Sequence, residues 1–290
     1  MTIDPELAWE WFMDGPLPPD SPAWGEGPVV SALELPGLRS FYARLPAHNR
    51  TTTTEAHQIG IAFTAHSGLI MQTGGTARRI DAPAGEVYVT GDLPVHWSEV
   101  SGPTEALEMY PDNGLLQVAG VDWAEIRPSL GTRDGVVFAT ACILRRAHLG
   151  DGLADIEAST LAHRVARHLA SNYQVAGRLP RADRGVLGTR AMERVVEHVD
   201  GNMAGPITLD SLAVVVCLSP FHFARAFKRT TGMTPHAYVT ARRMEEAKAR
   251  LLRRSGSVSD NAQAVGYSNL SHFRRVFHRV VGVLPGQLTG

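Results

Sequence analysis

The strongest constraint on the fold of this chain is a pattern that occurs twice near its C-terminus. Its two copies lie 50 residues apart, as His222-Phe223, Arg225, Phe227, Gly232, Pro235 and His272-Phe273, Arg275, Phe277, Gly282, Pro285. The two aromatic residues of each copy share one helix face, and the Arg between them points elsewhere. The Gly and Pro that follow predict a helix end and a turn. We therefore expect two equivalent short helices, each with an apolar edge and a basic edge.

Charge divides the chain into two regions. Residues 185–290 carry 14 Lys and Arg against 7 Asp and Glu, whereas residues 1–184 carry 14 against 22. A basic region beside an acidic remainder is expected where one domain meets phosphates, although chance and solvated helix faces are the alternative explanation. We expect two domains, of which the C-terminal one binds nucleic acid.

Cysteine usage and hydropathy indicate the compartment. The two cysteines, Cys142 and Cys217, lie far apart without metal-ligand spacing. This excludes a disulfide framework and fits a reducing cytoplasm. Residues 1–11 lack the positive charge of a signal peptide, and no apolar run reaches the roughly 18 residues of a membrane span. We expect a cytoplasmic protein without a membrane partner.

The N-terminal region is expected to contain an arm, a barrel and helices, in that order. Residues 1–28 contain six prolines, which predicts an arm. Short β-prone runs with turns between them follow at 58–63, 69–71, 77–80, 86–90, 95–97 and 106–110. This spacing predicts a small antiparallel barrel or jelly roll. A helix is expected over 121–126, and an amphipathic helix over 153–171 carries an apolar stripe of Leu153, Ile156, Leu161, Val165 and Leu169.

The C-terminal region reads as helices only, after a linker at 176–181. We expect them at 187–199, after caps at Thr208 and Ser219, at 235–254, and at 258–265 and 269–280. A short helix, a tight turn and a basic helix form a helix-turn-helix, whose second helix fits the DNA major groove. The helix at 235–254 would span roughly 30 Å, close to the roughly 34 Å between successive major grooves on one face of DNA.

In this C-terminal region the sequence resembles the AraC/XylS family. The resemblance runs over Leu212-Ala213, Ser219-Pro220, the first copy of the repeat, Tyr238, Arg242 and Ala247, then Val265-Gly266-Tyr267-Ser268, Ser271 and the second copy. It implies a bacterial transcription regulator of the α+β class. The all-α domain at 185–290 would hold two helix-turn-helix units joined by a long helix. The region at 29–180 would be a cupin-like antiparallel β barrel with following helices, used for sensing or dimerisation.

The resemblance also places the residues that meet double-stranded DNA in two adjacent major grooves. Its base-reading positions correspond to Phe221, Ala224, Arg225, Leu270, Ser271 and Arg275. Arg225 and Arg275 are the strongest candidates, because an Arg side chain binds guanine in a bidentate manner. The residues expected at phosphates are His222, Lys228, Arg229, Arg274 and His278. For each Arg, a solvated surface position is the structural alternative.

Two residues depart from the family pattern. Asn261 stands where a branched apolar residue usually packs the second unit, and a buried amide there costs stability unless it is hydrogen-bonded. Leu284 replaces a small residue before Pro285. These departures bear on how well the second unit fits DNA.

The function of the N-terminal region is open between two classes. A small-molecule effector in the barrel would meet His57, Trp97 and Tyr110, although these side chains could equally fill the barrel. The alternative is a metal-dependent cupin enzyme with a DNA-binding tail. The sequence lacks the clustered His and Glu ligands that such an enzyme would need, since His57, His66 and His96 are isolated. We therefore expect no catalytic residue, metal or cofactor. The helix at 153–171 is a candidate homodimer contact, but packing within the domain explains its stripe equally well.

Overall fold

The protein has two compact units, Met1–Pro180 and Arg181–Gly290. The computed structural model describes residues 29–45, 52–54, 56–73, 76–91, 95–97, 104–174 and 185–289. The predicted arm at 1–28 and linker at 176–181 lie outside these residues. The N-terminal unit combines β-strands with α-helices, and the C-terminal unit is helical.

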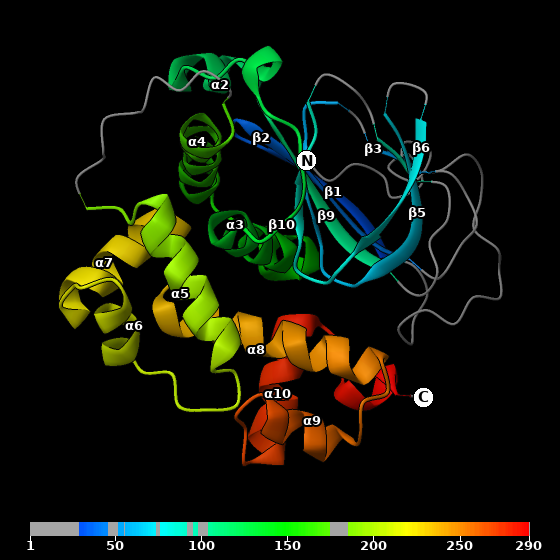
Figure 1. Ribbon diagram of the computed structural model, residues 1–290, viewed down its shortest axis with the longest axis vertical. Coiled ribbons are helices and arrows are strands. Elements are labelled where there is room, and N and C mark those ends of the chain that lie inside the picture. Colours follow the sequence, from blue (N-terminus) through cyan, green and yellow to red (C-terminus); the bar gives the residue numbers. More distant parts are fainter. Residues whose placement is uncertain are drawn as a thin grey trace. The chain divides into compact units, whose positions relative to one another are not determined.

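An antiparallel six-stranded sheet forms the centre of the N-terminal unit (Figure 1). Its strand order is β1-β2-β9-β4-β7-β10, with bounds Val29–Leu35 (β1), Leu38–Leu45 (β2), Ile59–Ala62 (β4), Val87–Val89 (β7), Thr104–Pro111 (β9) and Ser129–Thr132 (β10). Two further ladders pair Thr52–Thr54 (β3) with Val95–Trp97 (β8), and His66–Thr73 (β5) with Thr76–Ala82 (β6). The predicted antiparallel strands are therefore present.

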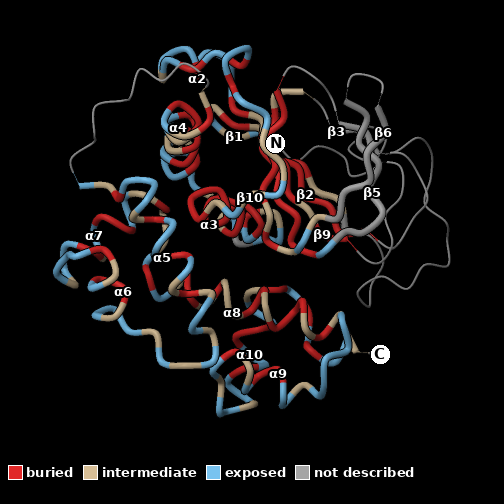
Figure 2. The backbone as a smooth tube through the Cα atoms, in the orientation of Figure 1, coloured by how far each residue is buried: buried red, intermediate tan, exposed pale blue. Residues whose placement is uncertain are grey.

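Helices cover one face of the sheet. They are Asn113–Ala119 (α2), Gly135–Arg146 (α3) and Asp155–Asn172 (α4), with a 3-10 turn at Trp123–Glu125 and a π-helical turn at Ala147–Asp151. The ladders β3–β8 and β5–β6 lie on the other side of the sheet from α3 and α4 (Figure 1). Buried positions concentrate where the sheet meets these two helices (Figure 2).

The register of β2 against β9 sorts the side chains between the two faces. Arg44 pairs with Glu105 and Phe41 with Glu108, and neighbours in a pair point to the same side of a sheet. The Glu105 face meets the helices, because the Arg145 Nη1 atom of α3 lies 3.4 Å from Glu105 Oε1. The Glu108 face is the one turned away from α3 and α4.

One helix prediction for this unit is wrong, and one helix was missed. The helix expected over 121–126 is a three-residue 3-10 turn, and the α-helix α2 lies before it. Helix α3 was not predicted at all. Its residues are buried nearly all around, including Val137, Ala141 and Leu144, so it has no polar face to produce a helical period.

The amphipathic helix is present as α4, and most of its stripe is confirmed. Leu161, Val165 and Leu169 are buried against α2, α3 and the sheet. Ile156 was wrongly placed in that stripe, since its side chain is 78% exposed. Because the stripe is covered by its own unit, it gives no support to a homodimer contact through 153–171.

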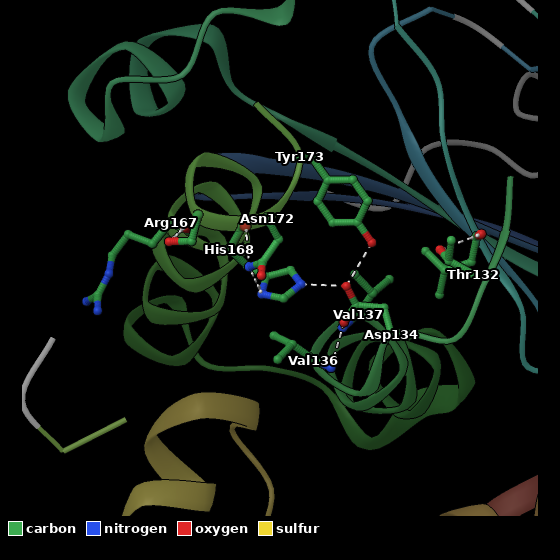
Figure 3. A network of polar contacts seen from close by, with 10 residues as sticks. Thr132, Asp134, Val136, Val137, Arg167, His168, Asn172 and Tyr173 are labelled. Atoms are coloured by element: carbon green, nitrogen blue, oxygen red, sulfur yellow. Dashed lines mark hydrogen bonds and ion pairs between the residues drawn. The ribbon is translucent and has the colours of Figure 1, made fainter. Parts of the chain in front are cut away.

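A polar cluster joins the start of α3 to the end of α4 (Figure 3). The Asp134 carboxylate caps α3 by accepting from the backbone N–H groups of Val136 and Val137. Its second oxygen accepts from the Tyr173 hydroxyl at 2.8 Å and lies 2.5 Å from His168 Nε2. Burial raises the pKa of Asp134, but His168 and these hydrogen bonds outweigh burial and lower it from 3.8 to about 2.

The C-terminal unit contains six α-helices among its described residues 185–289. They are Thr189–Gly201 (α5), Leu209–Val215 (α6), Pro220–Thr231 (α7), Pro235–Leu252 (α8), Val258–Ala264 (α9) and Leu270–Val281 (α10), followed by a 3-10 turn at Pro285–Leu288. All six were predicted; α5 is displaced by two residues from the predicted 187–199, and α8 ends two residues before the predicted 254. No single helix in the described part of the chain is long and apolar enough to cross a membrane. Helices α6 and α7 would be long and apolar enough only if they were taken together, and they are bent by 80° relative to each other.

We expect Asp134→Asn to destabilise the N-terminal unit by about 2 kcal/mol at neutral pH. The lowered pKa of the Asp134 carboxyl means that its contribution is present above its unfolded value of 3.8 and is lost as the pH falls towards about 2. The difference between wild type and variant should therefore shrink over that pH interval. All five tryptophans lie within residues 1–180, so tryptophan fluorescence during denaturant unfolding measures this unit.

Asp112→Asn is the matched control for this prediction. Asp112 also caps a helix, α2, through two backbone N–H groups, but it is exposed. Asn and Asp are nearly equivalent caps, so this variant should change the stability little. Equal effects of the two substitutions would show that the contacts of Asp134 with His168 and Tyr173 add nothing.

Candidate nucleic-acid interface

The first helix pair is α6 followed by α7. The Thr208 hydroxyl caps α6, and Ser219 caps α7 with Pro220 at the first helical position, as predicted. Phe223 and Phe227 are fully buried with ring centroids 5.5 Å apart. This pair anchors α7 to the core, and Gly232 ends the helix in the left-handed conformation, at φ 83°.

The second pair, α9 followed by α10, repeats this construction. Ser257 caps α9, and the Asn269 side chain caps α10 by accepting from the N–H of His272 at 2.8 Å. Phe273 and Phe277 are fully buried with the same centroid separation of 5.5 Å. The predicted core role of the four phenylalanines is confirmed, and so is the turn role of Gly282, at φ 84°.

The outward faces of α7 and α10 are basic and contain no acidic residue. Neither helix sequence includes an Asp or a Glu. Arg225 and Arg275 are exposed at equivalent positions. The guanidinium carbon of Arg225 lies 5.5 Å from the centroid of the Phe221 ring, which is 64% exposed. Each helix therefore presents a positive face suited to a polyanion.

The residues predicted to read bases or touch phosphates all lie on these outward faces. Ala224 and Leu270 are half-buried; the remainder are exposed, namely Phe221, His222, Arg225, Lys228, Arg229, Ser271, Arg274, Arg275 and His278. The Arg229 side chain also lies close to the segment before α5, because a Cβ built on Gly185 would lie 2.8 Å from Arg229 Nη1. Two exposed basic residues of α10 were missed, His272 and Arg279. His272 is the repeat partner of His222, so the repeat could have identified it.

The comparisons with known proteins concern this unit. A family model described as "Helix-turn-helix domain" matches residues 212–289. The bifunctional transcriptional activator/DNA repair enzyme AdaA of Bacillus subtilis is 28% identical over 119 residues, which is 41% of this chain and 56% of the relative. The XylDLEGF operon transcriptional activator 2 of Pseudomonas putida is 30% identical over 103 residues, which is 34% of this chain and 66% of the relative.

A solved structure is similar to the same region. It is a transcriptional regulator of Chromobacterium violaceum described as containing an AraC-type DNA-binding domain. It is 24% identical, covers 34% of this chain and 89% of its own, and has a TM-score of 0.33. The C-terminal unit is an AraC-type DNA-binding domain. The chain spans less than two thirds of the length of either relative named above.

The AraC-type domain accommodates the buried amide of Asn261 with a full set of hydrogen bonds. Asn261 is 0% exposed. Its Nδ2 atom donates to the carbonyl oxygens of Gly256 and Ser257, at 3.2 and 2.9 Å, and its Oδ1 atom accepts from Arg250 Nε at 2.9 Å. The expected cost of a buried amide is thereby offset. Leu284 is 50% exposed, so it does not crowd the core.

A second polar cluster lies on the Glu108 face of the N-terminal sheet. The Glu108 carboxylate accepts from the hydroxyls of Tyr88 at 3.3 Å and Tyr110 at 2.9 Å. The Tyr110 hydroxyl also contacts the Gln58 side-chain oxygen. Gln58 is 0% exposed, and its Nε2 atom has no hydrogen-bond partner among the described residues. Burial and the Glu108 charge raise the pKa of Tyr88, so its phenol remains protonated.

Of the three predicted effector residues, Tyr110 belongs to this cluster. His57 is stacked on Trp123 of the 3-10 turn, with ring centroids 5.3 Å apart. Trp97 lies in β8, and its side chain is outside the described part of the structure. Sequence reasoning missed Gln58, Tyr88 and Glu108, because Tyr88 and Glu108 alternate with apolar residues in their strands, Gln58 directly precedes β4, and none belongs to a motif. Within the described residues, no group of three or more His, Cys, Asp or Glu could hold a metal ion.

We expect Asn261→Ala to destabilise the AraC-type domain by about 2 kcal/mol, since it removes three hydrogen bonds and leaves a cavity. Asn261→Leu should cost less, because a Leu occupies the matching position in α6, Leu212, at 2% exposure. Far-ultraviolet circular dichroism during thermal unfolding measures both effects. Gln263→Ala, in the same helix but exposed, is the control. Equal melting shifts for Asn261→Ala and Gln263→Ala would contradict this assignment.

Proposed function

We propose that the protein is a sequence-specific transcription regulator that places α7 and α10 in two adjacent major grooves of double-stranded DNA, as two helix-turn-helix units. The observation that carries this proposal is the pair of exposed arginines, Arg225 and Arg275, on two acid-free helices of equal construction. Helix α8, with 18 residues, spans about 27 Å. That length is comparable to the roughly 34 Å between successive major grooves on one face of DNA.

The side chains on the outward faces divide by chemistry into those suited to base edges and those suited to phosphates. Arg225 and Arg275 suit guanine, whose O6 and N7 atoms accept both arms of a guanidinium. Ser271 can bond to any base edge, and Phe221, Ala224 and Leu270 offer apolar contact to a thymine methyl group. His222, Lys228, Arg229, Arg274 and His278 suit phosphates, which position a protein without reading sequence.

The proposal extends to the N-terminal unit as a cupin-like sensing domain. The buried cluster of Gln58, Tyr88, Glu108 and Tyr110 supports a small-molecule effector there, because it gathers polar side chains on the sheet face turned away from α3 and α4. Nothing on the described residues favours the metal-dependent enzyme, so it is not proposed.

Replacing a reading arginine should relax sequence preference at one position. We expect Arg225→Ala and Arg275→Ala each to lose about 1–3 kcal/mol of discrimination at one base step, in different halves of the bound site. Selection of binding sites from random duplexes, performed with each full-length variant, measures this loss. If Arg225→Ala selects the same sequences as the wild type with the same stringency, the base-reading role is wrong.

Replacing a phosphate-binding residue should act on all sequences alike. Lys228→Ala should weaken binding to every duplex by a similar factor and reduce the slope of log K against log salt by about one. Fluorescence anisotropy titrations at several salt concentrations give that slope. Arg167→Ala is the control, since Arg167 is exposed on α4 of the other unit and the substitution removes the same charge. An unchanged salt slope for Lys228→Ala would reject the phosphate contact.

A further inference from the structure

The two helix pairs of the AraC-type domain are joined by more than helix α8. Arg243, in the middle of α8, is half-buried, and its Nη2 atom donates to the carbonyl oxygen of Gly205 in the loop between α5 and α6. This loop precedes the first helix pair. The same guanidinium faces Gly266, in the turn between α9 and α10 of the second pair. A Cβ built on Gly266 would lie 3.0 Å from Arg243 Nη2 and 3.1 Å from its Cζ atom.

The backbone of the first half reaches the same point. The built Cβ on Gly266 would also lie 3.1 Å from the carbonyl oxygen of Met203. The loop after α5, the Arg243 side chain and the turn of the second pair are therefore stacked against one another. Tyr267, next to Gly266, lies near enough for the Arg243 charge to lower the pKa of its hydroxyl, which burial raises.

The first helix pair provides an internal comparison for Gly266. Cys217 occupies the matching place in the turn between α6 and α7. Its N–H bonds to the Val214 carbonyl at 3.0 Å, as that of Gly266 bonds to the Gln263 carbonyl at 2.9 Å. Both residues have a positive φ, 56° for Cys217 and 81° for Gly266. Since Cys217 shows that such a turn can carry a side chain, the close approach of Arg243 and Met203 is a separate requirement for glycine at 266.

We propose that Arg243 is a positioning residue that fixes the orientation of α7 relative to α10, and so sets the spacing of the two DNA segments that the domain reads. The role in setting the spacing of the DNA segments rests on the proposed two-groove binding, and the role in orienting the helices does not. A guanidinium suits the role because its fixed fork can bridge groups on two sides of a helix with little loss of freedom. Its neighbour Arg242 makes a different contact, since its Nη2 atom lies 2.6 Å from Asp200 Oδ1 at the end of α5.

The orientation can be measured without DNA. Spin labels are attached at Lys228→Cys on α7 and His278→Cys on α10, in full-length protein carrying Cys217→Ser, because Cys217 is exposed and Cys142 is buried. Pulsed electron–electron resonance gives the distribution of distances between the labels. We expect a single narrow distribution with Arg243 present, a broadened or shifted one for Arg243→Met, and no change for the control Arg242→Met. A distribution unaltered by Arg243→Met would overturn the inference.

The spacing is measured on the unlabelled protein with duplexes whose two recognised segments are moved apart or together by single base pairs. The wild type should prefer one spacing by about tenfold or more, because simultaneous engagement depends on geometry. Arg243→Met should bring that ratio close to one, whereas Arg242→Met should keep it. Retention of the preference by Arg243→Met would contradict the role in spacing. If the wild type shows no preference while the label distances respond to Arg243→Met, two-groove binding fails and the positioning role stands.

Two further variants keep the test decisive if Arg243→Met does not fold, which circular dichroism would show. Arg243→Lys retains the charge but loses the fork, and should broaden the label distances to a lesser degree. Gly266→Ala disturbs the same contact from the opposite side and should shift them. Wild-type distances in both variants would reject the inference.

Discussion

Burial of two phenylalanines, one helical turn apart, is the interaction on which the rest of the C-terminal unit depends. In α7 these are Phe223 and Phe227, and in α10 they are Phe273 and Phe277, all with no exposed surface. Burial of each such ring contributes about 2 kcal/mol or more to the stability of the folded unit. Fixing two rings on one face of a short helix also fixes its rotation about its axis. The arginines between them must then face solvent, so the core determines where the charge is displayed.

The repeat was predictable because its information is local. Caps, phenylalanine spacing and the terminal glycines lie within about a dozen residues, and each has a specific backbone consequence. The sequence therefore predicted the helices of residues 185–289 to within two residues at most ends. Helix α3 and the polar cluster around Glu108 were not predictable in this way. Helix α3 is buried on nearly all sides, and Gln58, Tyr88 and Glu108 meet only when three strands pair.

The N-terminal sheet also contains buried charged residues that the sequence did not predict. Strand β2 buries Ser40 and Arg44 as well as its apolar residues. Arg44 and Arg145 both approach Glu105, whose carboxylate also accepts from the Tyr42 hydroxyl at 2.7 Å. Removing a charge from water is costly, and such a group is tolerated only with several partners. These partners come from β2 and α3, which lie more than a hundred residues apart, so no local sequence pattern predicts their contacts.

The two helix pairs reach the same geometry by different means, and the differences identify where the second pair is constrained. Leu212 packs α6 through its apolar side chain, whereas Asn261 packs α9 through hydrogen bonds that include Arg250 of α8. Cys217 turns the chain in the first pair without a close neighbour that forbids its Cβ, whereas Gly266 does so against Arg243 and Met203. In both comparisons the second pair carries the extra connection to the linking helix or to the first half. A hydrogen-bonded contact is directional where an apolar contact permits sliding. These contacts support the proposal that the second pair is held in register with the first, as binding of both helices to one rigid piece of DNA would require.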